Sequence, residues 1–211
     1  MKAYYAWIAA LLLVAGCNTP ALDNLGNIGK ESDPTRFYTL RAIEQAMPEG
    51  AAAMPYTLVG VGPVMVTDYL DRSQIVIRVT DNQLELSEFD RWAGNPDKEI
   101  QRVLAANLAT LLGTSRITTY PWKTAIVPEI SVEVNVERFE YAYTGETWLV
   151  ANWQVFTQDG RNIVAFQRSE LKRASGKEYN EIAQALSELV ADLSTQIASE
   201  IRKTAAPSTV R

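Results

Sequence analysis

A strand, an acidic corner and a hairpin follow one another in LVGVGPVMVTDYLDRSQIVIRVTDNQLELSEFDRW, residues 58–92. The first strand, Val59–Val66, is rich in β-forming residues but contains Gly60, Gly62 and Pro63. Proline removes a backbone donor and glycine weakens a strand, so we expect a bulge or kink here. Asp68–Arg72 then turns the chain.

The second half of this stretch has the pattern of a β-hairpin. Apolar and polar residues alternate from Gln74 to Thr80, and the alternation resumes at Leu84. The Asp81-Asn82 pair between the two runs accepts the backbone conformation of a tight turn. These residues predict two antiparallel strands joined by a two-residue turn.

Two amphipathic helices are predicted outside this stretch. The first starts at Asn95-Pro96-Asp97, with Asn95 as N-cap, and stops at Gly113. For the second, Ser175 and Glu178 have the spacing of a capping box, and the helix runs to Arg202-Lys203.

The remaining strands are read from period-two alternation. Phe37–Ile43 predicts a first strand, and 44–55 predicts a surface loop. Ile130–Val136 alternates strictly, and the phase changes near Glu137-Arg138, where we expect a bulge or a strand bend. Asp159-Gly160 predicts a hairpin turn. The fold class that follows is α+β, with a largely antiparallel sheet and the two main amphipathic helices on one face.

Several runs together resemble a known family. GVGPVMVTDYLDRSQIVIR at 60–78, FDRW at 89–92, IQRVLAANLATLL at 100–112 and FYTL at 37–40 are similar to the PqiC/YmbA family of ABC-type transport auxiliary lipoproteins of Gram-negative envelopes. This chain has Thr67-Asp68 where the family often has a proline. The resemblance implies a periplasm-facing lipoprotein that works beside an MCE-domain protein in lipid transport between two membranes. It also implies a homo-oligomeric ring.

The N-terminus has the outline of a lipoprotein signal peptide. Lys2 is followed by an apolar run to Val14, and small residues precede Cys17. The apolar run is shorter than the ~20 residues that span a bilayer. We therefore predict cleavage before Cys17 and transfer of a diacylglyceryl group to its sulfur, which gives a triacylated cysteine carrying fatty acids such as palmitate. Because Asn18 follows, we predict sorting to the outer membrane with the domain facing the periplasm.

This interpretation divides the chain into four segments. Residues 1–16 are the predicted signal peptide, and 17–34 are the predicted lipidated N-terminus and flexible tether, polar and interrupted by Gly and Pro. Residues 35–204 are predicted as a single α+β auxiliary lipoprotein domain, and 205–211 as a disordered tail.

Composition narrows the function classes. The net charge is −5 and the isoelectric point about 4.9, which disfavours a nucleic-acid partner. The chain has no histidine, so the commonest general base and metal ligand are missing. Cys17 is the single cysteine, which excludes an intrachain disulfide and a multi-cysteine metal site. We expect no metal, no cofactor and no enzymatic activity.

The acidic corner of Asp68, Tyr69, Asp71 and Arg72 is one candidate site, for partner binding or for structure. A hydrolase using Asp68 and Asp71 as paired carboxylates would need one of them protonated near neutrality. The favoured interpretation is structural: the two carboxylates cap backbone donors and neutralise Arg72.

Arg91-Trp92 is the second candidate site. Arginine and tryptophan are enriched at binding hot spots, so the pair could dock a partner. The favoured alternative is an internal contact between the cation and the ring.

Four aromatic residues leave a further question open. They either fill the interior or line an apolar surface on the sheet face that the helices leave uncovered, with core packing favoured for most. The four are Tyr141, Tyr143, Trp148 and Phe156.

Together these observations favour a non-enzymatic, outer-membrane-anchored accessory component of an MCE/ABC-type intermembrane lipid transport system. The alternative is a periplasmic lipoprotein that binds a lipid or other apolar ligand on its own, which requires a concave apolar pocket.

Overall fold

The structure is a computed structural model that describes residues 33–44, 53–54, 57–123, 125–157 and 162–205. The chain divides into two units, and the boundary lies between Pro34 and Thr35. Nearly all described residues belong to the second unit, which contains the sheet and both helices. Cys17 and residues 206–211 of the tail predicted at 205–211 lie outside the described residues, whereas Ala205 is the last residue of the second helix.

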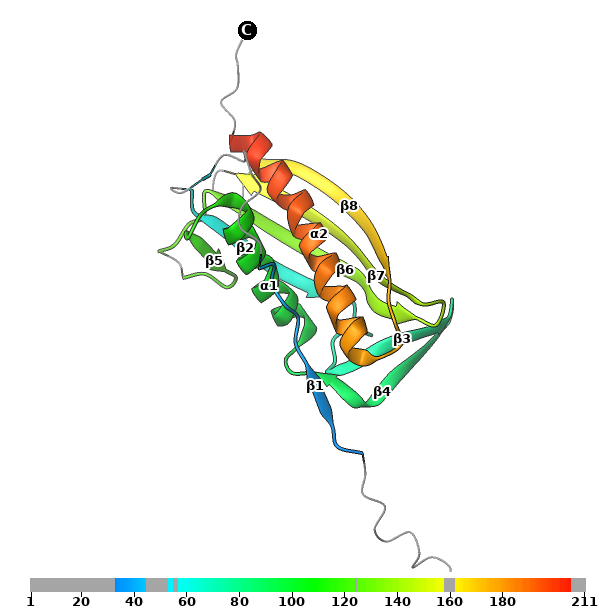
Figure 1. The fold of residues 1–211 in the computed structure, drawn as a ribbon. Helices are drawn as coiled ribbons and strands as arrows, with labels where there is room; N and C mark the ends of the chain where they lie inside the picture. Colours follow the sequence, from blue (N-terminus) through cyan, green and yellow to red (C-terminus); the bar gives the residue numbers. More distant parts are fainter. Residues whose placement is uncertain (1–32, 45–52, 55–56, 124, 158–161, 206–211) are drawn as a thin grey trace, which may run out of the picture. The chain divides into compact units, whose positions relative to one another are not determined.

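Eight strands and two helices make up the described part of the second unit (Figure 1). In chain order they are β1 (Arg36–Tyr38), β2 (Val59–Val66), β3 (Gln74–Thr80), β4 (Gln83–Trp92), α1 (Pro96–Leu112), β5 (Ile117–Thr119), β6 (Ile130–Ala142), β7 (Glu146–Thr157), β8 (Asn162–Ala174) and α2 (Tyr179–Ala205).

The sheet is mixed, which corrects the prediction of a largely antiparallel sheet. Antiparallel pairing joins β3 to β4, β6 to β7 and β7 to β8. Parallel pairing joins β1 to β4, β2 to β5, and both β2 and β3 to β6. The α+β class is confirmed; the prediction failed because alternation identifies strands and neighbouring hairpins, whereas the parallel pairs join distant segments.

Strand β6 is the strand at which the sheet branches. One of its edges pairs with β7 along its whole length. Its other edge pairs with β2 as far as Val136 and with β3 at Tyr141 and Ala142. The sheet therefore divides into two branches beyond β6, one ending in β5 and the other in β4 and β1.

Both helices lie on one face of this sheet (Figure 1). Helix α1 packs on β2 and β5, α2 packs on β6, β7 and β8, and the two helices contact each other. The strands turn alternate apolar side chains toward them, and these are almost fully buried: Val132, Val134, Val136, Leu149, Ala151, Trp153 and Val155. Burial of this face supplies the main driving force for folding.

The kink predicted in the first strand is confirmed and has a visible cause. The register between β2 and β6 shifts between Val61 and Val64. Gly62 has φ 112°, and a Cβ there would clash with the side-chain amide of Gln101. That amide donates to the carbonyls of Val61 and Tyr120, at 2.9 Å each. Glycine is needed because a side chain would displace Gln101 from these carbonyls.

The helix ends agree only in part with the sequence. Gly113 ends α1 in the left-handed conformation, as predicted, but the Asn95 side chain makes no cap hydrogen bond. At α2 the predicted Ser175 cap is wrong, because its hydroxyl contacts the carbonyl of Gly176. Instead Glu181 reaches back to the backbone N–H of Glu178 at 3.3 Å, so capping occurs three residues later.

The N-terminal strand is shorter than predicted. β1 ends at Tyr38, whereas the alternation suggested a strand to Ile43. Leu40 is nevertheless buried, so apolar residues of this segment pack without strand pairing. The predicted loop at 44–55 and the Asp159-Gly160 turn lie mostly or wholly outside the described residues; the strands on either side of that turn, β7 and β8, are antiparallel.

Candidate functional site

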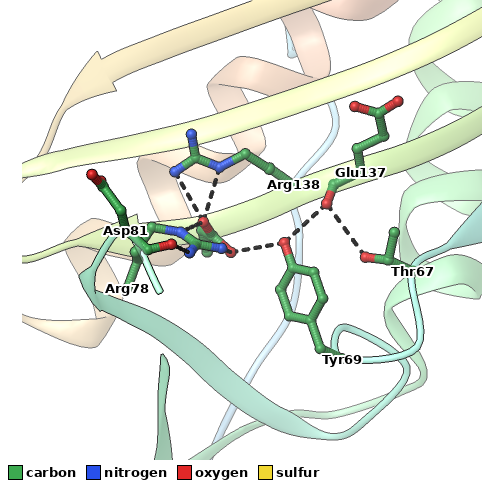
Figure 2. A network of polar contacts seen from close by, with 7 residues as sticks. Thr67, Tyr69, Arg78, Asp81, Glu137 and Arg138 are labelled. Carbon is green, nitrogen blue, oxygen red and sulfur yellow. Dashed lines mark hydrogen bonds and ion pairs between the residues drawn. The ribbon is translucent and has the colours of Figure 1, made fainter. Parts of the chain in front are cut away.

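The predicted bulge in β6 is confirmed at Glu137. Val136 and Arg138 pair with the adjacent residues Ala151 and Val150 of β7, so Glu137 is the extra residue. Its carbonyl oxygen accepts hydrogen bonds from the hydroxyls of Tyr69, at 2.9 Å, and Thr67, at 3.3 Å (Figure 2). The side chains of Thr67 and Tyr69 therefore satisfy the backbone carbonyl of the extra residue in the bulge.

A fully buried carboxylate lies beside this bulge. Glu140 has no exposed side-chain surface and accepts from Nε and Nη2 of Arg78, from Nε of Arg138 at 3.0 Å, and from Tyr69 at 3.0 Å. Arg78 also donates to the carbonyl of Asp81 at 2.9 Å (Figure 2). We call Tyr69, Arg78, Arg138 and Glu140 the polar corner. It joins the 67–72 turn, β3 and β6.

Electrostatics favour this arrangement. The hydrogen bond to Glu140 raises the pKa of Arg78, which holds the guanidinium charged. Burial, with the neighbouring Glu140, raises the pKa of Tyr69 to about 12. The phenol therefore stays neutral and remains a donor at physiological pH, and the polar corner combines two positive charges with one buried negative charge.

Trp148 lies next to the polar corner, on the sheet face that the helices leave uncovered, which we call the open face. The Arg138 guanidinium lies 4.7 Å from the Trp148 ring centroid and the Lys172 ammonium lies 5.2 Å from it. Lys172 also pairs with Glu146 at 3.0 Å. These are cation–π contacts, and they hold the ring between two cations rather than in an apolar patch.

The other three aromatic residues divide between core and surface. Tyr141 is buried on the helix face, as core packing predicts. Tyr143 is 52% exposed and bonds Glu85 at 3.1 Å. Phe156 is half-buried on the open face. The four therefore do not form one surface.

The rest of the acidic corner is a turn. The N–H of Asp71 donates to the carbonyl of Asp68, and neither side chain is buried. Among the described residues no ion pair joins either of them to Arg72, so the expected neutralisation is not seen. Leu70, between them, is buried in the core.

The side chains of Arg91 and Trp92 have different environments. Trp92 is only 4% exposed and packs on Phe139, with ring centroids 5.9 Å apart. The cation–ring contacts of the described residues involve Trp148, not Trp92. Trp92 is therefore a core residue, while half-buried Arg91 pairs in the strand ladder with Phe37.

A second buried carboxylate, Asp90 of β4, binds side chains of the first strand, β1. Its side chain is 4% exposed and accepts from Nε and Nη2 of Arg36, at 2.7 and 2.8 Å, and from the Tyr38 hydroxyl at 2.8 Å. Ser87 lies 3.3 Å away. The hydrogen bond from Arg36 holds the pKa of Asp90 below its ordinary value. Two of the three residues of β1 are thus bound to one carboxylate.

Sequence reasoning missed both buried carboxylates. Glu140 stands between Phe139 and Tyr141 at an ordinary polar position of an alternating strand, and Asp90 lies inside the FDRW run, beside the more conspicuous Arg91 and Trp92. A signal was available for Glu140: Arg138 lies two positions away, on the same strand face.

The cavities lie elsewhere. One of about 350 Å³ lies between 41–44 and α2, lined by Arg41, Glu44, Gln184 and Glu188 together with Ala42, Ile43, Ser187 and Ala191. Charged side chains line it on both sides, Arg41 and Glu44 on one and Glu188 on the other. The described residues include no group of acidic or cysteine side chains placed to hold a metal ion. None of the described helices is long and apolar enough to cross a membrane.

Comparison with known proteins gives the family. The sequence pattern of the ABC-type transport auxiliary lipoprotein component family matches residues 38–198, from β1 to the second half of α2. The chain belongs to this family. The resemblance seen in the GVGP, FDRW and helix runs is thereby confirmed.

Individual relatives agree along the whole length. The chain is 26% identical over 203 residues to the intermembrane transport lipoprotein PqiC of Escherichia coli K12, covering 96% of this chain and 99% of that protein, and equally to PqiC of Shigella flexneri. Two crystal structures share the fold, each with a TM-score of 0.66 and 99% of its chain covered. One is an uncharacterised protein, 22% identical, covering 80% of this chain, and the other is from Xanthomonas campestris, 14% identical, covering 81%.

Proposed function

We propose that this protein is a non-enzymatic outer-membrane lipoprotein that serves as an accessory component of an MCE/ABC-type intermembrane lipid transport system. The observation that carries the proposal is the match to the transport auxiliary lipoprotein family across nearly the whole domain. Relatives of the same length named as intermembrane transport lipoproteins support it.

The chemistry of the described residues supports a binding role rather than catalysis. The two buried carboxylates are saturated by arginine and tyrosine donors, so neither is free to act on a substrate. Asp68 and Asp71 sit in a turn at the surface. We expect the Asp68→Asn, Asp71→Asn double variant to keep full transport function in cells, whereas loss of function in a folded protein would revive the hydrolase hypothesis.

The proposed anchor is an acylated Cys17. In this proposal residues 1–16 are removed and 17–34 connect the lipid to the domain at 35–204. A single acyl chain binds membranes with a constant of only about 10⁴ M⁻¹, so stable anchoring needs more than one chain. Mass spectrometry of the mature N-terminus and density fractionation of envelopes test this: we expect acylated Cys17 in the outer-membrane fraction, and flotation with inner membrane would contradict the placement.

The proposed partner is an MCE-domain protein that spans the periplasm. The test is a crosslinked pull-down from envelopes with the full lipoprotein, with Cys17→Ala as the unanchored control, and mass spectrometry of the recovered proteins. Recovery of an MCE-domain protein with the anchored bait supports the accessory role. Recovery of no transport component with a correctly anchored bait would contradict it and favour a lipoprotein that binds an apolar ligand independently.

The family resemblance also suggests a homo-oligomeric ring. A ring requires head-to-tail contacts, in which different surfaces of neighbouring copies meet. Native mass spectrometry of the detergent-solubilised lipoprotein tests this, and a strictly monomeric chain would contradict it.

A further inference from the structure

Exposed apolar side chains gather at one end of the sheet. The strand register places Ile117 of β5, Val59 of β2, Ile130 of β6, Thr157 of β7 and Asn162 of β8 at the same level. Within a few residues of this level lie large apolar side chains with exposed fractions from 43% to 67%: Tyr120, Val127, Ile163, Val164 and Phe166. A cluster of this kind marks a surface that contacts a partner or a membrane.

A bulge at Val164 sets the direction of the β8 side chains at this end. Ile163 pairs with half-buried Phe156, and the register shifts between Phe156 and Val155, so Val164 is the extra residue. Val155 is buried under the helices, so its neighbour Phe156 and the paired Ile163 lie on the open face. Phe166, one position beyond the partner of Val155, lies on the same face. The bulge therefore brings these apolar side chains together on the open face.

The loop after β5 extends this surface across β2. Gly60 alternates with buried valines of β2 that face the helices, so it faces the open side. A Cβ on Gly60 would lie 2.6 Å from Pro128 and 3.1 Å from Trp122, so these two side chains cover β2 on the open face. Tyr120 packs edge-on against Trp122, with ring centroids 5.3 Å apart. Only β6 and β7 separate Gly60 from Ile163, a distance of about 14 Å.

The chemistry of this surface favours phospholipid as its partner. Tyrosine and tryptophan are enriched at membrane interfaces, because each ring has an apolar body and a polar tip. The run 120–128, YPWKTAIVP, contains exposed Lys123 and no acidic residue. A lysine in this position attracts anionic headgroups while its stem stays on apolar surface. Two carboxylates border the surface: Glu129 turns one oxygen to the backbone N–H of Leu58 at 3.1 Å, and Glu133 is half-buried on the open face.

The predicted tether is long enough for this end of the domain to touch the membrane. With Cys17 acylated, residues 17–34 join the lipid to the domain and span at most about 60 Å. Pairing through β4 and β3 places the start of β1 near the level of Phe139 in β6, about 30 Å along that strand from Ile130. Tethering also keeps the local concentration of the domain at the membrane high, so a weak contact suffices.

We propose that this end of the sheet is a membrane-contact surface, which lies on phospholipid headgroups with Trp122, Ile163 and Phe166 at the interface. The inference rests on the proposed lipid anchor and adds a second contact, which fixes the orientation of a domain that one flexible tether leaves free to rotate. A ring with its axis normal to the membrane presents this end of every copy to the same bilayer, so the contact is compatible with the proposed ring.

Vesicle flotation tests the proposal on the mature chain, residues 17–211, with Cys17→Ala so that no acyl chain contributes to binding. The vesicles contain phosphatidylethanolamine and phosphatidylglycerol. We expect the chain to float with them, and Ile163→Ser and Phe166→Ser each to weaken binding about tenfold. Phe37→Ser is the matched control, because Phe37 is 65% exposed and Phe166 is 67% exposed, but Phe37 lies in β1, away from this end. We expect the control to leave binding unchanged.

Further measurements separate this result from misfolding and from the proposed transport role. Far-UV circular dichroism and melting temperature establish that each variant is folded. A chain that does not float, or a loss of binding as large for Phe37→Ser as for Phe166→Ser, would overturn the proposal. A chain that does not float, but whose crosslinked transport partner is lost with Phe166→Ser, would assign the surface to a protein instead. Because the vesicles hold no partner and the chain no acyl group, flotation can succeed or fail independently of the anchor and of the transport role.

Discussion

Replacing Glu140 by glutamine tests the polar corner most directly. The substitution keeps the size of the side chain but removes the charge and turns one acceptor into an NH₂ donor, which then faces donor groups. The side chains of Arg78 and Arg138 are only 19% and 30% exposed, so water replaces little of the lost interaction.

The magnitude follows from this burial. Removing one partner of a buried ion pair costs about 3–5 kcal/mol, because the remaining charge is left uncompensated. At about 2–4 °C per kcal/mol for a domain of this size, the melting temperature of Glu140→Gln falls by about 6–20 °C.

The assay is urea unfolding followed by circular dichroism, with Glu146→Gln as the matched control. Glu146 pairs with Lys172 at 3.0 Å, but the lysine is 55% exposed, so we expect a loss of only about 0–1 kcal/mol. A loss for Glu140→Gln no larger than that of the control would refute the claim that this carboxylate organises the corner.

Three further predictions concern single residues. Arg36 lowers the pKa of Asp90 in the folded protein, so the stabilisation by Asp90 is present above its pKa in the unfolded chain and is lost as pH falls through its pKa in the folded protein. Asp90→Asn should therefore lower the free energy of unfolding at pH 7. It should also make the melting temperature depend less on pH at acid pH. The pKa of Tyr69 is raised to about 12, so the stabilisation by its neutral hydroxyl is complete below the ordinary pKa of tyrosine and is lost as pH rises toward 12. Tyr69→Phe should remove this loss of stability at alkaline pH. It should also lower the free energy of unfolding at pH 7 by about 1 kcal/mol, as measured by urea titration. Gly62→Ala combines a positive φ with a clash against Gln101 and should cost about 1–3 kcal/mol by thermal melting, whereas Gly145→Ala, with open space at its Cβ, isolates the backbone part of that cost.

The sequence was informative wherever the interaction was local. The alternation on either side of Asp81-Asn82 identified the β3–β4 hairpin. The phase change predicted a bulge or bend near Glu137-Arg138, and Glu137 is the extra residue. Both depend on side chains a few positions apart, whose faces follow directly from the strand period.

The pairing of distant strands and the burial of polar side chains could not be predicted from the sequence pattern. The alternation of apolar and polar residues in β2 and β6 does not show that the two strands are parallel, so the sheet was wrongly predicted to be largely antiparallel. The polar corner was half-predicted: Tyr69 was singled out, but its partner Glu140 was not, because a glutamate in an alternating strand is ordinarily solvated. Only the fold brings Arg78 over it and buries the carboxylate.

The branched pairing of β6 also has a consequence for the order of folding. The hairpins β3–β4, β6–β7 and β7–β8 close short loops and can form on microsecond timescales. The contacts of β6 with β2 join residues about seventy positions apart, as between Val59 and Ile130. The entropy cost of closing such a long loop must be offset before these contacts stabilise the chain. Domains dominated by such distant pairs fold slowly, so we expect the β6–β8 meander to form early and the β2 branch, with α1 on top of it, to complete the rate-limiting step.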